Sequence, residues 1–275
     1  MVTLKEILSS SLSEKQLQHL TTSYDVIGDI IILEIKDELS KKEKMIANAL
    51  LDMHKNVKVV CKRVGIHTGK YRKQKVKVIA GEKRKTTIHK ELNTRLKVHV
   101  ENVYFSPRMS SERKRIMDQI NPGEKILVMF SGCAPYPCVF AKNTKAKEIV
   151  GVEINPQGHE LALENVALNK LYNVRLYLGD VRKVIPKLKE KFDRICMPLP
   201  KGGEDFLDIA LGAAKKNAII HFYDFLHESE FEEASQKISD ACDTAGRTCK
   251  IISLTKCGQH APRVFRICVD FQVLN

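Results

Sequence analysis

The chain has 275 residues, of which 43% are hydrophobic, and its formal net charge is +13. This length suggests one or two domains with room for a buried core, which excludes a disordered basic tail. The sequence contains neither an apolar run of about 18 residues nor the apolar segment of a secretory signal. We therefore expect a cytoplasmic protein, and the charge favours an anionic partner, of which nucleic acid is the commonest.

The first 110 residues predict a small α+β domain. Apolar residues at helical spacing cover 4–20 and 38–53, and apolar or alternating segments predict strands at 29–35, 57–64, 74–80 and 95–105. We expect these strands to form one sheet. Basic residues are dense between Lys55 and Lys97, and few acids interrupt them. Such a run is typical of a solvated surface and also of a track for phosphates.

Residues 111–275 change to a regular alternation of strands and helices. Strands are predicted at 125–129, 148–152, 173–178, 193–197 and 217–223, and helices at 157–168, 181–190, 204–214 and 228–245. We expect Pro186 to break the helix that begins at residue 181. This order predicts a parallel, Rossmann-like doubly wound sheet with right-handed crossovers. The last two strands, 248–255 and 263–273, are joined directly and predict a final antiparallel hairpin.

The eight cysteines contain no CxxC pair, which is the spacing typical of zinc ribbons and fingers. A chain of this size without a secretory signal is expected to keep its thiols reduced. Cys133 and Cys138 are separated by four residues and have no other candidate ligand nearby in the sequence. We therefore predict no metal site.

Ligands of doubly wound sheets bind at the carboxyl ends of the strands, and four such ends carry suggestive residues. Gly132, in the turn after the first strand of the sheet, allows a ligand to approach the backbone closely. Glu153 ends the second strand and can accept hydrogen bonds from both hydroxyls of a ribose. Asp180 follows the third strand and can accept from an adenine amino group, and Pro198 begins a stiff Pro-Leu-Pro wall after the fourth.

Each of these features also has a structural explanation. An acid after a strand often caps the next helix, and a proline-rich turn can simply end a strand. Together, at successive strand ends of one sheet, they predict an adenosine pocket. Because the chain has no GxGxxG fingerprint for a pyrophosphate, the predicted cofactor is S-adenosylmethionine rather than NAD.

Seven further stretches occur in order along the chain: SYDVIGD (23–29), TIHKE (87–91), YFSPR (104–108), SER (111–113), EINP (153–156), LENVALN (163–169) and APR (261–263). In them the chain resembles the class I methyltransferases that modify the guanosine next to the anticodon, at tRNA position 37. FSGCAPYP (130–137) and HFYDFLHESE (221–230) are most similar to the archaeal branch that also serves wyosine synthesis. The resemblance covers residues 23–275, nearly the whole chain.

Two departures from the family pattern stand out. The family usually has Asn-Leu-Pro where this chain has Pro-Leu-Pro from Pro198, although the archaeal wyosine branch tends to carry proline there. Family members also usually have an additional N-terminal domain that reads the outer corner of the tRNA, and we expect this chain to lack it.

The resemblance implies methyl transfer from S-adenosylmethionine to N1 of guanosine 37, with the anticodon stem-loop of a tRNA as the partner of a monomeric enzyme. It assigns Glu112 as the general base for the N1 proton and Arg72 as the partner of the O6 charge. Tyr104 and Arg108 match positions that line the active site. The predicted cofactor contacts are Arg113, Phe130, Gly132, Glu153, Ile154, Asp180, Val181 and Pro198.

Several alternatives stay open at this point. From spacing alone, Glu112 is a capping acid paired with Arg115, Arg72 belongs to a solvated basic face, and Tyr104 is core. We expect His89, His221 and His227 to be structural rather than catalytic. The enzyme could also methylate a tricyclic wyosine intermediate. Two other functions are an aminocarboxypropyl transferase of wybutosine synthesis that uses the same cofactor, and a non-catalytic RNA-binding protein on a methyltransferase fold.

Overall fold

The computed structural model describes residues 2–65, 69, 71 and 73–275. The chain forms two compact units, one of Met1–Lys90 with Arg95–Pro107 and one of Glu91–Thr94 with Arg108–Asn275. The segment Glu91–Thr94 groups with the second unit although it precedes the boundary that we predicted at residue 110. That boundary stays a prediction of where independently folding domains divide.

The first unit contains a four-stranded sheet in the order β1-β2-β3-β4, packed against helices. Ser13 caps a helix of its own, since its side chain accepts from the amide of Gln16 and the Gln16 side chain accepts from the Ser13 amide. The helix predicted over 4–20 is therefore two helices. The elements are α1 (Leu4–Leu8), α2 (Glu14–His19), β1 (Tyr24–Ile27), β2 (Ile30–Leu33), the 3₁₀ helix η1 (Asp37–Lys42), α3 (Glu43–Met53), β3 (Val59–Arg63) and β4 (Val76–Gly81).

The expectation of one sheet before residue 110 is wrong. Strands β5 (Thr86–Glu91) and β6 (Thr94–His99) form a separate two-stranded sheet. Leu92 and Asn93 connect them with φ of 42° and 59°, the left-handed pair that a tight hairpin turn requires. At the end of β4, Gly81 has φ of 82°, and a Cβ there would lie 2.0 Å from the Lys58 carbonyl oxygen. Only glycine fits this close approach to the chain just before β3.

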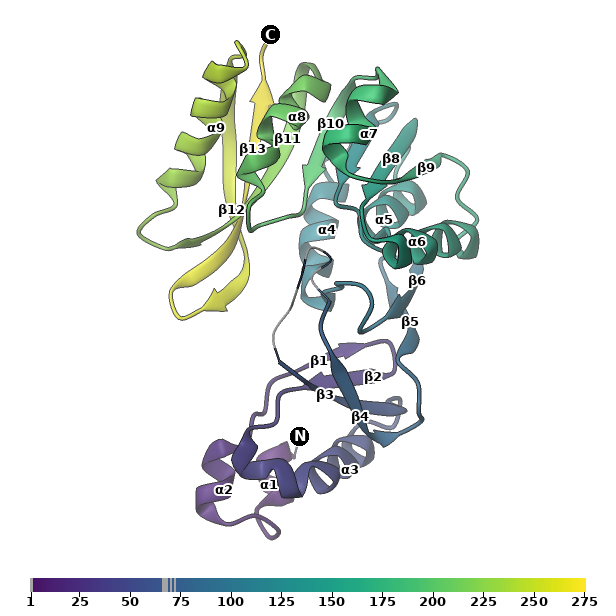
Figure 1. The fold of residues 1–275 in the computed structure, drawn as a ribbon, viewed down its shortest axis with the longest axis vertical. Helices are drawn as coiled ribbons and strands as arrows, with labels where there is room; N and C mark the ends of the chain where they lie inside the picture. The colour runs from purple at the N-terminus through teal and green to yellow at the C-terminus, as the bar shows by residue number, and fades with distance from the viewer. Residues whose placement is uncertain (1, 66–68, 70, 72) are drawn as a thin grey trace. The chain divides into compact units, whose positions relative to one another are not determined.

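The second unit is built on a seven-stranded sheet in the order β12-β13-β11-β10-β7-β8-β9 (Figure 1). Strand β13 pairs antiparallel with both β11 and β12, and the other neighbours are parallel. The predicted doubly wound sheet and its final antiparallel hairpin are therefore present. The strands are β7 (Lys125–Met129), β8 (Glu148–Glu153), β9 (Val174–Leu178), β10 (Phe192–Met197), β11 (Ala214–His227), β12 (Cys249–Ala261) and β13 (Val264–Val273).

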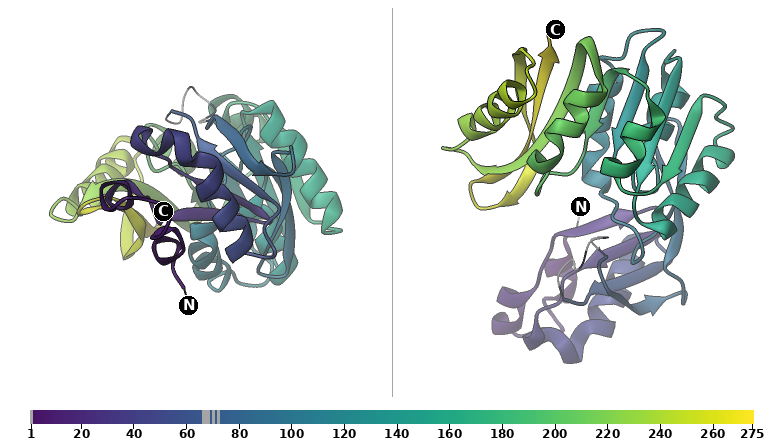
Figure 2. Two further views of the ribbon diagram at one scale, coloured as in Figure 1. Left: turned by 90° about the horizontal axis from the view of Figure 1, so that it is seen from below. Right: turned by 45° about the horizontal axis from the view of Figure 1, so that its top comes forward.

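Helices cover the two faces of this sheet and create two apolar cores (Figures 1 and 2). Alternate strand residues divide between them: Val128 and Cys196 belong to the core beneath α4 and α5, whereas Leu127 and Ile195 belong to the core beneath α7, α8 and α9. The helices are η2 (Pro107–Met109), α4 (Ser110–Met117), α5 (Pro135–Asn143), α6 (Pro156–Leu168), α7 (Val181–Leu188), η3 (Glu204–Phe206), α8 (Leu207–Ala213) and α9 (Glu232–Thr244).

Helix α7 differs from the prediction at one point. Pro186 lies inside the helix and does not break it. The helix ends two residues later because Lys189 adopts the left-handed conformation with φ of 54°. Since proline removes a single backbone donor, its cost in the last turn of a short helix is tolerated.

Candidate active site

The register of the parallel strands aligns their carboxyl ends at one edge of the sheet. The paired residues are Met129 with Val152, Glu153 with Leu178, and Val128 with Cys196. The residues that follow these strands therefore occur along the same edge. Six predicted cofactor contacts belong to this edge, which we call the cofactor edge: Phe130, Gly132, Glu153, Ile154, Asp180 and Pro198.

The loop after β7 is held in an unusual backbone conformation. Phe130, Gly132 and Ala134 have φ of 54°, 57° and 62°. For non-glycine residues this region costs roughly 1–2 kcal/mol each, and such conformations concentrate at ligand sites. Two hydrogen bonds fix the loop, from the Ser131 amide to the Val152 carbonyl (3.0 Å) and from the Gly132 amide to Glu153 Oε2 (2.6 Å).

Glu153 is held by backbone groups on both sides of its carboxylate. Besides the Gly132 amide on Oε2, the Asn155 amide donates to Oε1 at 2.7 Å. Burial raises the pKa of Glu153, and the hydrogen bonds from backbone amides oppose this shift. The Ile154 amide also hydrogen-bonds this carboxylate. Because a carboxylate has about four acceptor positions, Glu153 can still accept from a ribose hydroxyl. A Cβ at Gly158 would lie 3.3 Å from Glu153 Cγ, so glycine leaves room for this side chain.

The acid after β9 caps a helix, as the structural explanation expected. Asp180 Oδ1 accepts from the amide of Arg182 at 3.0 Å, at the start of α7. A cap uses one carboxylate oxygen, so this role and an adenine contact are compatible. The Val181 side chain is buried in the core beneath α7. A cofactor contact at Val181 would therefore have to use its backbone.

Two residues at this edge were missed by the sequence analysis. The Phe130 ring meets the Phe206 ring edge to face, with centroids 5.0 Å apart, and the Arg182 guanidinium lies 4.0 Å from the Phe206 centroid. Arg182 also donates to the Asp205 carbonyl at 2.8 Å, which keeps it over the ring. The signal available in the sequence was weak, because Phe206 lies in an irregular segment between a proline turn and a helix.

The segment after β10 forms a tight turn at Pro198. The Leu199 amide donates to the Met197 carbonyl at 2.6 Å, which closes a three-residue turn around the proline. A Cβ at Gly203 would lie 2.3 Å from the Leu199 carbonyl oxygen, so the segment folds back closely on itself. This geometry is consistent with the stiff wall that Pro-Leu-Pro predicts.

Glu112 lies on α4 and is 4% exposed. Its Oε1 accepts from the Tyr223 hydroxyl at 2.7 Å and from Arg115 Nη2 at 2.8 Å, and its Oε2 accepts from Arg115 Nε at 2.7 Å. The pairing with Arg115 that spacing predicts is therefore present. The Cys257 thiol also lies within hydrogen-bonding reach of the Glu112 carboxylate. These contacts do not decide against a catalytic role, because they orient the carboxylate and a thiol is only a weak donor.

Arg113 is buried in an ion pair with Glu91. Its Nε and Nη2 donate to the two Glu91 oxygens at 2.5 and 2.6 Å, and the two side chains are 2% and 4% exposed. This two-point geometry is the strongest form of an arginine–carboxylate pair. A cofactor contact for Arg113 stays a prediction.

The remaining predicted catalytic residues are spread over both units. Arg72 lies outside the described residues. Tyr104 belongs to the first unit, is 41% exposed and lines a cavity of about 130 Å³ with Asp25 and Arg63. Arg108 belongs to the second unit and is exposed on η2.

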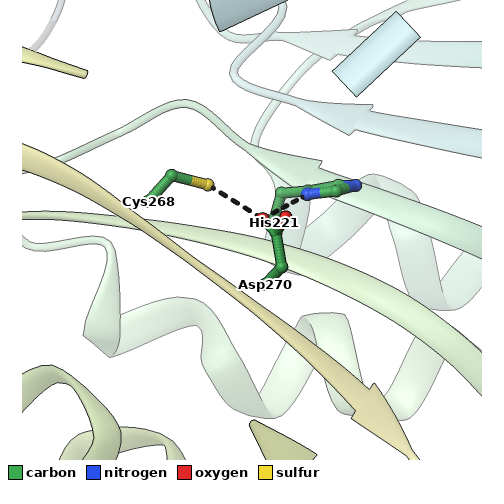
Figure 3. A group of neighbouring side chains, drawn as sticks. All are labelled: His221, Cys268 and Asp270. Atoms are coloured by element: carbon green, nitrogen blue, oxygen red, sulfur yellow. Dashed lines mark hydrogen bonds and ion pairs between the residues drawn. The ribbon is translucent and has the colours of Figure 1, made fainter. Parts of the chain in front are cut away.

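Three buried side chains of the second unit, His221, Cys268 and Asp270, bring their ligand atoms within 4.8 Å of one another (Figure 3). Asp270 Oδ1 accepts from His221 Nδ1 at 2.7 Å and from Cys268 Sγ at 3.3 Å, and Oδ2 accepts from Arg115 Nη1 at 2.5 Å. Burial raises the pKa of the Cys268 thiol well above its ordinary value, which makes it a poor metal ligand. With an arginine already on the carboxylate, the donor set fits a hydrogen-bonded cluster rather than a cation.

The three histidines that we expected to be structural each form hydrogen bonds with other groups of the protein. His221 is fully buried between Asp270 and Arg194. His89 Nδ1 accepts from the Gly28 amide at 3.2 Å, and His227 Nδ1 accepts from the Ser229 amide at 3.3 Å.

Among the described residues, the helices are all too short or too polar to cross a bilayer.

The sheet order, the hairpin and the cofactor edge define a class I methyltransferase fold with a small α+β unit. Residues 87–252 match the TRM5/TYW2 methyltransferase domain, and residues 4–85 match the TYW2 N-terminal domain. The chain belongs to the TRM5/TYW2 methyltransferase family. The predicted family, fold class and kind of enzyme are thereby confirmed.

Characterised relatives cover most of this chain. It is 37% identical to the tRNA (guanine(37)-N(1))-methyltransferase Trm5b of Pyrococcus abyssi, over 92% of this chain and 76% of the relative. It is 34% identical to the tRNA (guanine(37)-N(1))/4-demethylwyosine(37)-methyltransferase Taw22 of Nanoarchaeum equitans, over 92% and 100%. It is 31% identical to the tRNA(Phe) (4-demethylwyosine(37)-C(7)) aminocarboxypropyltransferase of Methanocaldococcus jannaschii, over 90% and 96%.

Solved structures agree with this assignment. The crystal structure of Pyrococcus abyssi Trm5b has a TM-score of 0.89 at 35% identity and covers 96% of this chain and 79% of that one. The complex of aTrm5 with tRNALeu has a TM-score of 0.88 at 34% identity, with 100% and 78% covered. Pyrococcus horikoshii TYW2 in complex with MeSAdo has a TM-score of 0.82 at 26% identity, with 98% and 98% covered.

The predicted cofactor, S-adenosylmethionine, agrees with these findings. The cofactor edge of this chain fits it on its own evidence. The Glu153 carboxylate is fixed by backbone amides and keeps acceptor capacity for a ribose hydroxyl, and the buried Ser131 Oγ has no hydrogen-bond partner in the described structure. Gly132 leaves the loop backbone open to close approach.

Proposed function

We propose that this protein transfers a methyl group from S-adenosylmethionine to N1 of guanosine 37 in tRNA. The observation that carries the proposal is that one folded unit combines a cofactor edge built around Glu153 with a buried, hydrogen-bonded carboxylate at Glu112. Relatives named for this activity, at 34–37% identity over 92% of the chain, support it.

The chemistry requires an aligned donor and a base. When bound, S-adenosylmethionine supplies an electrophilic methyl group, and transfer is mainly a matter of alignment. Guanine N1 carries a proton at neutral pH, so its attack needs a general base. We assign this role to Glu112, whose three hydrogen bonds from Tyr223 and Arg115 fix the orientation of its carboxylate. Arg72 is assigned to the O6 charge, and Tyr104 and Arg108 to holding the base.

The β12–β13 hairpin supports tRNA as the partner. In both ribbon figures its tip projects beyond the neighbouring strands at the end of the sheet (Figures 1 and 2). The rings of Phe225 and His260 stack at 4.2 Å beside the hairpin, and the Arg266 guanidinium lies 5.1 Å from the Phe225 centroid. Arg263, 67% exposed, occupies the turn. Cations interleaved with aromatic rings are typical of surfaces that contact phosphates and unstacked bases.

We further propose that the protein binds the anticodon stem-loop of the tRNA, that it is a monomer, and that it is located in the cytoplasm. A 17-nucleotide stem-loop containing G37 should compete with full-length tRNA for binding, and light scattering of the complex should give one protein chain per RNA. A stem-loop that fails to compete at any concentration would contradict the proposed binding region.

The decisive experiment follows the product. Transcripts with G37 and with A37 are incubated with methyl-labelled cofactor, and digested RNA is analysed by mass spectrometry. We expect one methyl group on N1 of G37 and none on the A37 transcript. Equal label on both transcripts would refute the assignment of the target base.

The match of residues 4–85 to the TYW2 N-terminal domain favours a second candidate, aminocarboxypropyl transfer from the same cofactor. Against it, the identity to the guanosine methyltransferases Trm5b and Taw22, 37% and 34%, is higher than the 31% identity to the aminocarboxypropyltransferase. Cofactor labelled in the methyl group and cofactor labelled in the carboxyl carbon separate the two reactions. With RNA that carries the tricyclic wyosine intermediate, methyl label alone would indicate a second methylation substrate.

A further inference from the structure

We infer that Asp270 and His221 are positioning residues for Glu112, and that they act by sharing Arg115 so that this arginine holds the Glu112 carboxylate without neutralising it. The inference rests on the proposed role of Glu112 as the base. The cluster in Figure 3 is then part of the catalytic machinery of the second unit rather than an isolated buried pair.

The geometry is a continuous chain of side chains across one face of the sheet. Arg115 lies between two carboxylates, with Nε and Nη2 on Glu112 at 2.7 and 2.8 Å and Nη1 on Asp270 at 2.5 Å. Asp270 on β13 lies directly opposite His221 on β11 in the strand register and accepts from its Nδ1 at 2.7 Å. The chain continues from His221 Nε2 to Arg194 Nη1 at 2.9 Å.

Donor and acceptor chemistry fixes the protonation state of His221. Arginine can only donate, so Nε2 must accept from Arg194 and Nδ1 must carry the proton that Asp270 accepts. Burial also lowers the pKa of His221, with the hydrogen bond to Asp270 opposing it. The imidazole is therefore neutral and leaves the charge of Asp270 uncancelled.

Asp270 carries a full negative charge in this arrangement. Burial alone would raise the pKa of Asp270, but hydrogen bonds from His221 and Arg115 hold it well below its usual range. Arg194 cannot supply the missing charge, because its guanidinium is paired with Glu124 at 2.7 and 3.0 Å. Glu112, Arg115 and Asp270 together thus carry one net negative charge.

The other titratable groups that face Glu112 are neutral near pH 7. They are the hydroxyls of Tyr136 on α5 and Tyr223 on β11, and the thiols of Cys196, Cys257 and Cys268 on β10, β12 and β13, and burial raises the pKa of each. Arg115 and Asp270 are accordingly the charged side chains of the hydrogen-bonded network that holds Glu112. Without Asp270, Arg115 would pair wholly with Glu112 and stabilise its ionised form, which makes a weaker base.

The test is the pH dependence of kcat/KM for G37 methylation in the wild type and in Asp270→Asn. A reaction that depends on a carboxylate base loses activity at low pH, and this acid limb of the pH profile is the quantity compared. In Asp270→Asn the acid limb should move to lower pH by about one unit, and the plateau should fall by on the order of tenfold. Ser253→Ala is the matched control, because it removes a neutral hydrogen bond (3.3 Å) to the same Asp270 carboxylate. Its acid limb should coincide with that of the wild type.

A merely structural role gives a different result. If Asp270→Asn lowers thermal stability and the rate but leaves the acid limb in place, the inference is overturned. Arg115→Lys tests the same linkage even if Asp270→Asn fails to fold. It keeps a positive charge but loses the planar fork, so the rate should fall by roughly tenfold to a hundredfold while the limb stays near its wild-type position. An unchanged rate in Arg115→Lys would also overturn the inference.

A readout independent of turnover separates this inference from the proposed function. Carboxyl ¹³C NMR of the glutamates, with Glu112→Gln used for assignment, gives the Glu112 titration directly. A wild type that does not methylate G37 defeats the proposed function alone. A Glu112 titration that is the same with and without Asp270 defeats the positioning role, whatever the substrate.

Discussion

Two buried carboxylates of the second unit are held in opposite ways. Backbone amides fix Glu153: that of Gly132 in the loop after β7 at 2.6 Å, and that of Asn155, two residues along the chain, at 2.7 Å. Side chains fix Glu112, namely Arg115 on its own helix and Tyr223 on the distant strand β11. A carboxylate held by backbone amides keeps its geometry when remote side chains change. A carboxylate held by side chains is affected by the charges and packing of the groups that those side chains contact. Substitutions far from Glu112 should therefore change its chemistry.

The largest expected effect is at the carboxylate held by side chains. Glu112→Gln keeps the volume but removes the base, so the methylation rate at G37 should fall by roughly 10²–10⁴-fold. Cofactor affinity should stay at the wild-type value, because Glu153 is held without any contribution from Glu112. Single-turnover kinetics and calorimetry measure the two quantities. A variant with weak cofactor binding and normal turnover would reverse the two roles.

Removal of Asp270 should affect folding through the same network. Asp270→Asn leaves Arg115 and His221 with a weaker partner in a buried site, where breaking an ion pair costs about 3–5 kcal/mol. Because the pKa of Asp270 is lowered in the folded state, its contribution is present above the unfolded pKa near 4 and is lost as pH falls below it.

The free energy of unfolding of the variant should therefore be lower at pH 7, and the gap to the wild type should narrow below about pH 4. Urea unfolding at several pH values measures this difference. A gap that does not vary with pH would indicate that lost packing, rather than charge, causes the destabilisation.

At the carboxylate held by backbone, the effect should appear in binding. Glu153→Gln presents one acceptor oxygen instead of two and an amide that faces a backbone donor. Loss of a hydrogen bond to a charged group is worth about 1.5–3 kcal/mol, so the Kd for S-adenosylmethionine should rise by roughly 10- to 150-fold. Calorimetry with S-adenosylhomocysteine as a second ligand checks the result. Glu160→Gln makes the same chemical change at an exposed position of α6, serves as the control and should bind within a few-fold of the wild type.

The smallest effect is expected at the hairpin turn. Arg263 has φ of 58° in the turn between β12 and β13 and donates to Glu228 at 2.7 Å. Arg263→Gly relieves the left-handed strain of about 1 kcal/mol but removes one cation. Melting temperature should therefore hold or rise slightly, while tRNA affinity falls a few-fold and the slope of log K against log salt becomes shallower by about one. An unchanged salt slope would mean that Arg263 does not contact phosphate.

The sequence alone was sufficient to locate those features of the fold that depend on residues close together in the chain. Apolar runs bounded by turns located β7, β8 and β10 to within a residue or two, because burial on both faces leaves a continuous apolar signature. The alternation of strands and helices, which predicts a parallel sheet, then placed Glu153 and Asp180 at the ends of neighbouring strands. The i, i+3 spacing of Glu112 and Arg115 predicted their pairing on α4.

Only the tertiary structure decided which distant side chains meet. His221 and Asp270 are polar residues inside apolar strands, so the sequence signals that each needs a partner. Their partnership depends on the register of β11 against β13, 49 residues apart, and one residue of slip would turn them to opposite faces. The same holds for Arg113 and Glu91, 22 residues apart, and for Tyr223 and Glu112. Periodicity is a local property of the chain, whereas register is fixed by the whole packed sheet.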